Sequence, residues 1–449
     1  MSSEPPSTLA ASMKDKLIQQ ALERRLRGAG EGVAGPSLQS VQAAAAAVPE
    51  QFYRFDQHPA YLQLRVMLQS ATHMGLVNPF FKLHESLAGA QTDIGGQRYV
   101  NFASYNYLGY SGHPEVASAA REAIDCYGTS ASASRAVSGE RPLHRELEQA
   151  IAALYEVDDA ITFVSGHATN VTTIGYLFGP RDLIVHDELI HNSVLQGIKL
   201  SGARRLSFAH NDWQALDRLL GEQRQHFERV LVVLEGIYSM DGDYPDLPRF
   251  VEIKQRHRAF LMVDEAHSLG VMGATGKGIR EHYGLAGTDV DIWMGTLSKT
   301  LSSCGGYIAG ETALVQHLKF LAPGFLYSVG MPPSVAAAAL AALRRMAVDH
   351  DRVQALQARG QQFLRLAHEA GLDVATSTGL AVIPVITGSS LKATQLSSAL
   401  FCRGINAQPI LYPAVPEKTA RVRFFISCEH TEQEIAETVA IVAEELARL

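Results

Sequence analysis

Short apolar runs alternate with amphipathic stretches along most of the chain, from about Tyr99 onward. Five of the runs are rich in Val, Ile, Leu, Phe and Met, and they lie at 160–164, 183–185, 230–234, 260–263 and 291–294. Runs of this length are typical of parallel strands buried on both faces, and the amphipathic stretches between them are typical of covering helices. The pattern therefore predicts an α/β fold with a mostly parallel sheet and helices on both of its faces.

The pattern changes toward the C-terminus. Residues 331–371 are nearly all helix-forming, weaker strand signals follow at 381–386 and 421–426, and a final helix is expected over 431–449. We therefore expect a smaller α+β domain after the sheet. The predicted organisation is an appended helical and flexible segment at 1–50, an N-terminal arm at 51–100, a large domain at 101–339 and a small C-terminal domain at 340–449.

Composition and charge argue against several classes of protein. Apolar residues make up 47% of the 449 residues and charged residues 19%, as in ordinary globular proteins. The net charge of -7 argues against a nucleic-acid partner, because such partners select a basic excess. The four cysteines form no CxxC pair, and no segment approaches the roughly 20 apolar residues of a membrane span. We expect a cytoplasmic protein with reduced thiols, no metal site and no membrane span.

Polar residues follow several of the predicted strands directly, at the sheet edge where ligands of α/β proteins bind. Lys299 lies in Gly-Thr-Leu-Ser-Lys-Thr, among small residues that let a planar group approach its amine. Asp264 ends the run 260–263 and would be a costly buried charge without a partner. Taken alone, Lys299 would be interpreted as a surface lysine and Asp264 as one partner of a structural ion pair. Together they match pyridoxal 5'-phosphate (PLP), which requires an imine-forming amine and a carboxylate at its pyridine nitrogen.

Two further groups fit the same cofactor. His267 lies three residues after Asp264, a spacing that can reach the phenolic oxygen of the PLP ring. Ser165-Gly166-His167 occurs where a strand turns into a helix, so backbone N–H groups and the helix dipole can hold a phosphate there.

Seven motifs occur in the order and spacing of one enzyme family. They are Asn-Phe-Ala-Ser-Tyr-Asn-Tyr-Leu-Gly at 101–109, Gly-Thr-Ser-Ala-Ser-Ala-Ser-Arg at 128–135, His-Asp-Glu-Leu-Ile-His at 186–191, Glu-Gly-Ile-Tyr-Ser-Met-Asp-Gly-Asp at 235–243, Val-Asp-Glu-Ala-His-Ser at 263–268, Gly-Thr-Leu-Ser-Lys at 295–299 and Ala-Arg-Val-Arg at 420–423. Together they resemble the α-oxoamine synthases, fold-type I PLP enzymes that include serine palmitoyltransferase and 8-amino-7-oxononanoate synthase. The resemblance covers about residues 95–445 and implies a homodimer.

The resemblance implies a role for each matching residue. Lys299 would be the Schiff-base lysine, Asp264 the partner of the pyridine nitrogen and His191 the imidazole stacked on the ring; with His267 they would be the catalytic residues. Arg423 would bind the carboxylate of the amino acid, because a guanidinium can donate two parallel hydrogen bonds to it. The other implied cofactor contacts are Gly166, His167, Glu235, Ser239, Thr296 and Ser328.

Two positions depart from the pattern of the family. Several relatives carry an Asn that helps to hold the amino acid where this chain has Tyr105, as in sequences resembling eukaryotic serine palmitoyltransferase. This favours serine over glycine. Many members also carry Ser-Thr-Ser before the Pro-Pro pair, where this chain reads Ser328-Val-Gly, so Ser328 is the substitute for a phosphate contact across the subunit interface.

The implied reaction is a decarboxylative condensation of a small L-amino acid with an acyl thioester, which gives an α-amino ketone, CO2 and a free thiol. It would serve sphingolipid or secondary metabolite biosynthesis. A second hypothesis is a PLP aminotransferase on the same fold. A third is a non-catalytic partner subunit of a heteromeric synthase, against which the presence of Lys299, Asp264 and His191 argues.

The acyl donor is open between CoA and an acyl carrier protein. Residues 13–27 place apolar side chains at helical spacing opposite a face with five basic and two acidic residues. Such a face suits an acidic carrier protein. The alternatives are a helix that packs on its own dimer and an untied tail.

Overall fold

The computed structural model describes residues 48–73 and 78–449, and the chain divides into two compact units, Met1–Gly75 and Leu76–Leu449. In the first unit the described elements are η1 (Glu50–Phe52), η2 (Phe55–Gln57) and α3 (Pro59–His73). The helix expected over 13–27, with its hypothesis of carrier-protein binding, lies outside the described residues. No helix in the described ranges combines the length and the apolar character needed to cross a bilayer.

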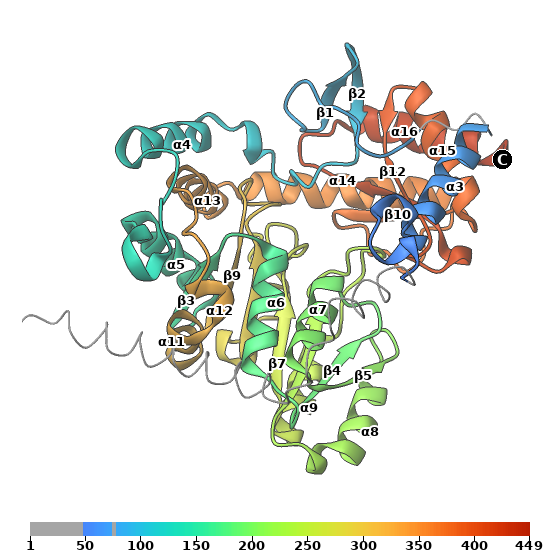
Figure 1. Ribbon diagram of the computed structural model, residues 1–449. Coiled ribbons are helices and arrows are strands. Elements are labelled where there is room, and N and C mark those ends of the chain that lie inside the picture. Colours follow the sequence, from blue (N-terminus) through green and yellow to red (C-terminus); the bar gives the residue numbers. More distant parts are fainter. Residues whose placement is uncertain (1–47, 74–77) are drawn as a thin grey trace, which may run out of the picture. The chain divides into compact units, whose positions relative to one another are not determined.

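The second unit is built on a seven-stranded sheet (Figure 1). Its strand order is β3-β9-β8-β7-β6-β4-β5, and within this sheet β9 runs opposite to the other six strands. The strands are β3 (Asp159–Phe163), β4 (Leu183–Asp187), β5 (Arg204–Phe208), β6 (Val230–Glu235), β7 (Phe260–Asp264), β8 (Ile292–Thr296) and β9 (Gly306–Gly310). The five predicted strands are confirmed, whereas β5 and β9 were not foreseen.

Both faces of this sheet are buried because its central strands carry apolar side chains at almost every position. Leu231 and Val233 of β6 point to one face, while Val230 and Val232 point to the other. The first face is covered by α6 (Gly166–Leu177), α7 (Asn192–Ser201) and α11 (Thr312–Leu321). The second face is covered by α5 (Pro142–Tyr155), α8 (Trp213–Gln223), α9 (Leu247–His257) and α13 (Pro333–Met346). The predicted α/β architecture with helices on both faces is confirmed.

A smaller α+β region follows the sheet, as predicted. Its antiparallel sheet has the order β10-β13-β12, from β10 (Val382–Ile386), β13 (Arg421–Phe425) and β12 (Gln408–Ile410). The helices of this region are α14 (His350–Glu369), α15 (Ser390–Cys402) and α16 (Glu432–Ala447). A second small sheet, in the order β1-β2-β11, joins β1 (Gln91–Ile94) and β2 (Gln97–Asn101) to β11 (Ile405–Asn406). The domain limits at 50, 100 and 339 stay predictions.

The remaining helices lie between these parts of the chain. They are η3 (Tyr110–Gly112), α4 (Pro114–Tyr127), η4 (Arg135–Gly139), η5 (Arg224–His226), α10 (Ile279–Tyr283), η6 (Gly287–Asp289), α12 (Pro323–Leu326) and η7 (Glu417–Thr419).

The loop after β6 fastens the large sheet to the C-terminal region through Gly242. This glycine has φ of 76°, and its carbonyl oxygen accepts hydrogen bonds from the amide (3.2 Å) and the hydroxyl (2.9 Å) of Thr378. A side chain at this position would collide with the carbonyl oxygen of Val382 in β10. The loop that carries Ser239 therefore requires glycine at 242, both for the backbone conformation and for the close approach.

We expect Gly242→Ala to lower the free energy of unfolding by more than Gly371→Ala, as measured by denaturant titration. Both glycines have positive φ, but a side chain at Gly371 would meet nothing within 4 Å. Each variant should lose about 1 kcal/mol to the unfavourable conformation, and Gly242→Ala a further 1–3 kcal/mol or so to overpacking. Equal losses in the two variants would contradict the assignment of Gly242 as a packing point.

Candidate active site

The polar residues that follow the strands meet at the carboxyl edge of the large sheet. Glu235 ends β6, Asp264 ends the adjacent β7, and Thr296 ends β8. Glu235 and Asp264 are direct partners in the parallel register, so two carboxyl groups lie side by side in the interior, with exposed fractions of 3% and 4%. Burial, followed by the charge of Asp264, raises the pKa of Glu235 well above its usual range. The site therefore contains an acidic pair that favours a nearby cation.

Lys299 lies just beyond β8, beside this acidic pair. Burial of its ammonium group lowers the pKa of Lys299 to about 8, and Asp264 and Glu235 oppose the lowering while Arg423 adds to it. Its Nζ lies 5.5 Å from the centre of the Tyr105 ring. An amine with this pKa is partly unprotonated near neutral pH, as nucleophilic and proton-accepting lysines must be.

The carboxylate of Asp264 is held from two sides. Its Oδ2 accepts a hydrogen bond from Asn170 Nδ2 (3.0 Å), and its Oδ1 accepts one from the amide of Ala266 (3.0 Å). No ion pair to Asp264 occurs within residues 48–73 and 78–449. The carboxylate is thus fixed by neutral donors, which leaves its charge available to a ligand.

His191 begins α7 as its N-cap. Its Nδ1 accepts hydrogen bonds from the amide (3.2 Å) and the hydroxyl (2.7 Å) of Ser193. Burial lowers the pKa of His191, although the charge of Asp264 opposes the lowering. The ring is therefore neutral near pH 7, and its proton lies on Nε2, because an amide N–H can only donate.

His267 is buried between aromatic side chains. Its Nδ1 lies 2.7 Å from the Tyr107 hydroxyl, and its ring stacks on that of Phe425 with centres 6.0 Å apart. Burial holds the pKa of His267 well below its usual range and that of Tyr107 well above its own. Both groups are consequently neutral and share one hydrogen bond. Tyr107 was not singled out from the sequence.

Two arginines on the central strand β13 differ in their partners. Arg421 donates to the Asp241 carboxylate at 2.6 Å, so its charge is neutralised. Arg423 donates instead to the carbonyl oxygen of Ser239 (2.8 Å), and its guanidinium lies 4.3 Å from the centre of the Phe425 ring. Its Nε is buried and has no hydrogen-bond partner in the described structure. Arg423 therefore carries an uncompensated charge with free donor capacity.

The start of α6 lies against Thr296. A methyl group on Gly166 would come within 2.8 Å of Thr296 Oγ1, so the helix terminus can approach the strand end only because residue 166 is glycine. Ser165 caps the helix by accepting from the amide of Ala168 at 3.4 Å. Within the described residues, the amides of Gly166 and His167 have no partner, as is usual for the first turn of a helix. Free amides of this kind, beside Thr296, are able to donate to an anion.

Comparisons with known proteins agree with this geometry. A model of the family Aminotransferase class I and II matches residues 97–442. The chain is 39% identical over 354 residues to an 8-amino-7-oxononanoate synthase of Fervidobacterium nodosum, covering 78% of this chain and 89% of that protein. It is 34% identical over 358 residues to 8-amino-7-oxononanoate synthase 1 of Bacillus subtilis, covering 80% and 91%.

A solved structure of serine palmitoyltransferase from S. paucimobilis, with a bound PLP–myriocin aldimine, superposes with a TM-score of 0.83. It is 28% identical and covers 86% of this chain and 98% of that one. The chain belongs to the class I and II aminotransferase family and, within it, to the α-oxoamine synthases. It is a PLP-dependent C-acyltransferase.

The residues of this α-oxoamine synthase fit PLP. The ring nitrogen requires an unpaired carboxylate, which Asp264 offers; the phosphate requires N–H donors, which the start of α6 offers; and the aldehyde requires an amine such as that of Lys299. Buried polar atoms without partners also surround this edge of the sheet, among them Glu235 Oε1 and Asn170 Oδ1. Such atoms are expected where a ligand supplies the missing contacts.

The remaining assigned residues differ in their placement. Ser239 and Tyr105 lie at the site, since the amide of Ser239 donates to Glu235 at 3.3 Å and the Tyr105 ring packs edge-on against Phe425 with centres 4.9 Å apart. Ser328 is not brought to Lys299 by a hydrogen bond; in the described structure its hydroxyl bonds only the carbonyl of Val329, at 3.3 Å. Its role as a phosphate contact between subunits stays a prediction.

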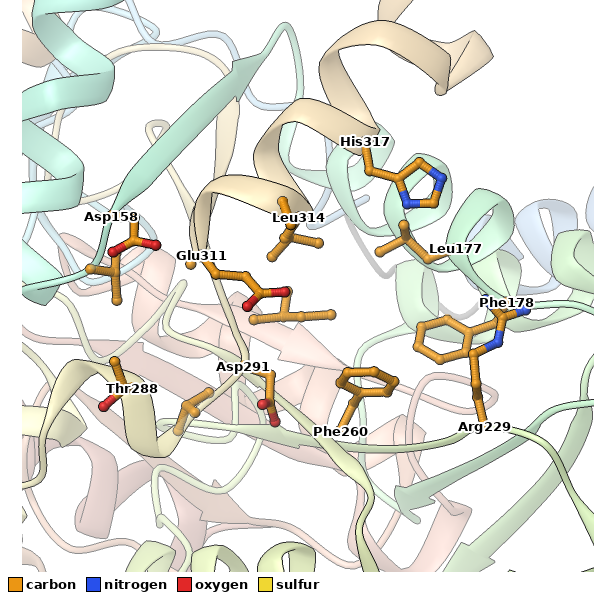
Figure 2. Close-up of a pocket in the computed structure, with 15 residues that line it drawn as sticks. Asp158, Leu177, Phe178, Arg229, Phe260, Thr288, Asp291, Glu311, Leu314 and His317 are labelled. Atoms are coloured by element: carbon orange, nitrogen blue, oxygen red, sulfur yellow. The ribbon is translucent and has the colours of Figure 1, made fainter.

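A cavity of about 340 Å³ lies at the opposite end of the sheet (Figure 2). Arg229, Phe260 and Asp291, which line it, directly precede or begin β6, β7 and β8, and none of the assigned site residues reaches it. Ligands of parallel sheets bind beyond the carboxyl ends of the strands, so this cavity is not the catalytic site.

His210 ties together two loops of the site. Its Nδ1 lies 2.9 Å from Asp187 at the end of β4, and its Nε2 lies 2.9 Å from Asp243 after β6. Thr376 of the C-terminal region donates to the same Asp243 carboxylate at 2.8 Å. Hydrogen bonds to both carboxylates outweigh burial and raise the pKa of His210 to about 10. The imidazolium is therefore a permanent cation at physiological pH, held between the loops that lead to His191 and Ser239.

We expect the stability that His210 provides to fall as the pH rises. Because its pKa is about 10 in the fold and near 6.5 in an unfolded chain, its stabilisation is complete below pH 6.5 and is lost between pH 6.5 and 10. Free energies of unfolding of the wild type and His210→Gln should converge over this range in denaturant titrations. Thr376→Val, which removes a neutral donor to Asp243, should differ from the wild type by a nearly constant amount; a constant difference for His210→Gln would contradict the charge assignment.

Proposed function

We propose that this α-oxoamine synthase condenses a small L-amino acid, with serine favoured, with an acyl thioester. A bond forms between the α-carbon, which has lost its proton, and the thioester carbonyl carbon, and the C–S bond breaks to release a thiol. The bond to the original carboxylate then breaks to release CO2, and the α-carbon takes up a proton in its place. The observation that carries the proposal is the unpaired guanidinium of Arg423 close to the partly unprotonated amine of Lys299. Arg423 matches the carboxylate of an amino acid, and the free amine of Lys299 can accept the proton of its α-carbon.

PLP, when bound, supplies an electron-accepting ring to which the amino acid is attached through its nitrogen. Lys299 is the residue that takes the proton from the α-carbon, because its lowered pKa leaves a free amine near neutral pH. Asp264, whose two oxygens accept from Asn170 and Ala266, would face the ring nitrogen and favour a proton there. The α-carbon is thereby acidified at the point where Lys299 acts.

Arg423 orients the amino acid by its carboxylate. The side chain extends from the central strand of a three-stranded sheet, and its contacts with Ser239 and Phe425 restrict its rotation. Burial lowers the pKa of Arg423, but an ordinary pKa so far above neutrality keeps the guanidinium charged. A carboxylate bound there regains the Coulomb energy that the unpaired cation lacks.

The two histidines serve the acyl half of the reaction. The neutral His191 carries its proton on Nε2 and can donate it to a developing oxyanion. His267 is also neutral, and its Nδ1 shares a hydrogen bond with the Tyr107 hydroxyl. Neutral imidazoles can serve the thioester carbonyl without adding a cation that would compete with Arg423 for the carboxylate.

Serine and alanine are the amino acids to be distinguished. Serine palmitoyltransferase uses serine by its name, whereas 8-amino-7-oxononanoate has a methyl group next to the amine-bearing carbon, as alanine would leave it. Tyr105 supports serine, because the centre of its ring lies 5.5 Å from Lys299 Nζ and its phenol can bind a hydroxymethyl group. Alanine has no group for this contact.

Assembly and acyl donor belong to the same proposal. We propose a homodimer, as the resemblance to the family implies. Ser328, in the segment after α12, would lie at its interface. The thioester is carried by CoA or by an acyl carrier protein.

We expect Arg423→Ala to raise the KM for the amino acid by roughly 10- to 100-fold, since a charge-assisted contact of about 1.5–3 kcal/mol is lost. PLP should remain bound, as measured by visible absorbance of the purified variant. The KM of Arg423→Lys, which keeps the charge without the two parallel donors, should lie between those of the wild type and Arg423→Ala.

Lys299→Ala should abolish condensation altogether, as measured by release of the free thiol. An unchanged KM in Arg423→Ala, or turnover by Lys299→Ala, would refute these assignments.

We expect kcat/KM to be higher for serine than for alanine and glycine in steady-state assays that detect the released thiol. Each amino acid is tested with both a long-chain acyl and a pimeloyl thioester. Tyr105→Asn should reduce the preference for serine over glycine, because the phenol that can bind the serine hydroxyl is removed. A wild-type preference for alanine with the pimeloyl donor would replace the serine assignment by 8-amino-7-oxononanoate synthesis.

A further inference from the structure

Asn170 connects the two residues assigned to the PLP ring, although no motif draws attention to it. It lies one turn into α6 and is 1% exposed. One amide hydrogen is donated to Asp264 Oδ2 (3.0 Å), and the other is donated to Ser193 Oγ (2.9 Å) on α7. Both donors of a single side chain are thus used, one toward the end of β7 and the other toward the start of α7.

Ser193 continues the chain of hydrogen bonds to His191. Its Oγ lies 2.7 Å from His191 Nδ1, and because that oxygen already accepts from Asn170, its hydrogen is free to be donated. The amide of Ser193 also donates to Nδ1, which therefore bears no hydrogen. The hydrogen bonds therefore run in one direction: Asn170 donates to Asp264 and to Ser193, and Ser193 donates to His191.

The packing of α6 against α7 sets the distance between Asn170 and Ser193. The two helices lie side by side (Figure 1), and Gly197 of α7 faces the backbone of α6. A side chain at Gly197 would approach the Asn170 carbonyl oxygen and the Ile174 Cβ to 2.9 Å. The close approach of the helices places Ser193 within hydrogen-bonding distance of Asn170.

We propose that Asn170 is a positioning residue that, with Ser193, holds the Asp264 carboxylate and the His191 ring in one fixed relation and keeps the His191 proton on Nε2. The inference rests on the proposed placement of the cofactor ring between Asp264 and His191. Asn170 touches neither the substrate nor the reacting atoms. It acts by immobilising both ring contacts through one buried amide, which is rigid because α6 and the sheet fix its two ends.

The test is a double-mutant cycle on PLP affinity. Apoenzyme of the wild type, Asn170→Ala, Ser193→Ala and the double variant is titrated with PLP, and the melting temperature of each apoenzyme is measured. Asn170→Ala should raise the dissociation constant by about 10- to 100-fold, Ser193→Ala by a smaller factor, and the double variant by no more than Asn170→Ala. Ser193→Thr, which keeps the hydroxyl, should recover most of the affinity lost in Ser193→Ala.

Thr173→Val is the matched control. Thr173 is fully buried on the same helix, and in the described structure its hydroxyl has no hydrogen-bond partner, so this variant alters α6 without touching the connection. Its PLP affinity should equal that of the wild type. Additive losses in the double variant, or unchanged affinity in Asn170→Ala, would overturn the positioning role. Asp264→Asn and His191→Ala are titrated alongside: if both bind PLP as the wild type does, it is the ring placement that fails.

Discussion

Burial of charge at the carboxyl edge of the sheet is the constraint on which the rest of the site depends. Lys299, Arg423 and Asp264 gather where water is largely excluded, and an isolated charge in such a place costs several kcal/mol. The protein meets this cost with neutral dipoles: Asn170 and Ala266 for Asp264, and the Ser239 carbonyl for Arg423. The charges are stabilised without being paired to one another, so each remains available to a ligand.

The structural ion pairs of the same molecule show the contrast. Arg421, two residues from Arg423 on the same strand, is paired with Asp241, and the buried Arg135 is paired with both Glu140 and Glu148. Their charges are cancelled inside the protein and can hold loops together but cannot bind substrate. All three arginines are at least partly buried, but only Arg423 has no carboxylate partner in the described structure. The missing partner, rather than burial, is what allows it to recognise the carboxylate of a ligand.

Elements far apart in the chain must hold these unpaired charges in place. Lys299 and Asp264 come from the large sheet, Arg423 from the C-terminal sheet, and Tyr105 and Tyr107 from the segment after β2. Gly242 and the Asp187–His210–Asp243 cluster fasten the loops between the two sheets. The reaction therefore depends on contacts distant from the reacting atoms, because a small shift of the C-terminal sheet would separate Arg423 from Lys299.

The sequence by itself determined the five buried strands, since a strand covered on both faces needs a continuous apolar run, and it determined the family through motifs of unusual residues in fixed order. It did not reveal β5, because most of the side chains of this strand are exposed and polar and form no apolar run. It did not reveal β9 either, because the glycines at both ends of this strand are typical of a turn. The roles of Asn170, Ser193, Tyr107 and His210 became visible only in the tertiary structure, because each of them has a partner between 23 and 160 positions away in the chain. A motif records which chemical groups a reaction requires, whereas the orientation of those groups is set by the packing of helices and sheets that bring distant residues together.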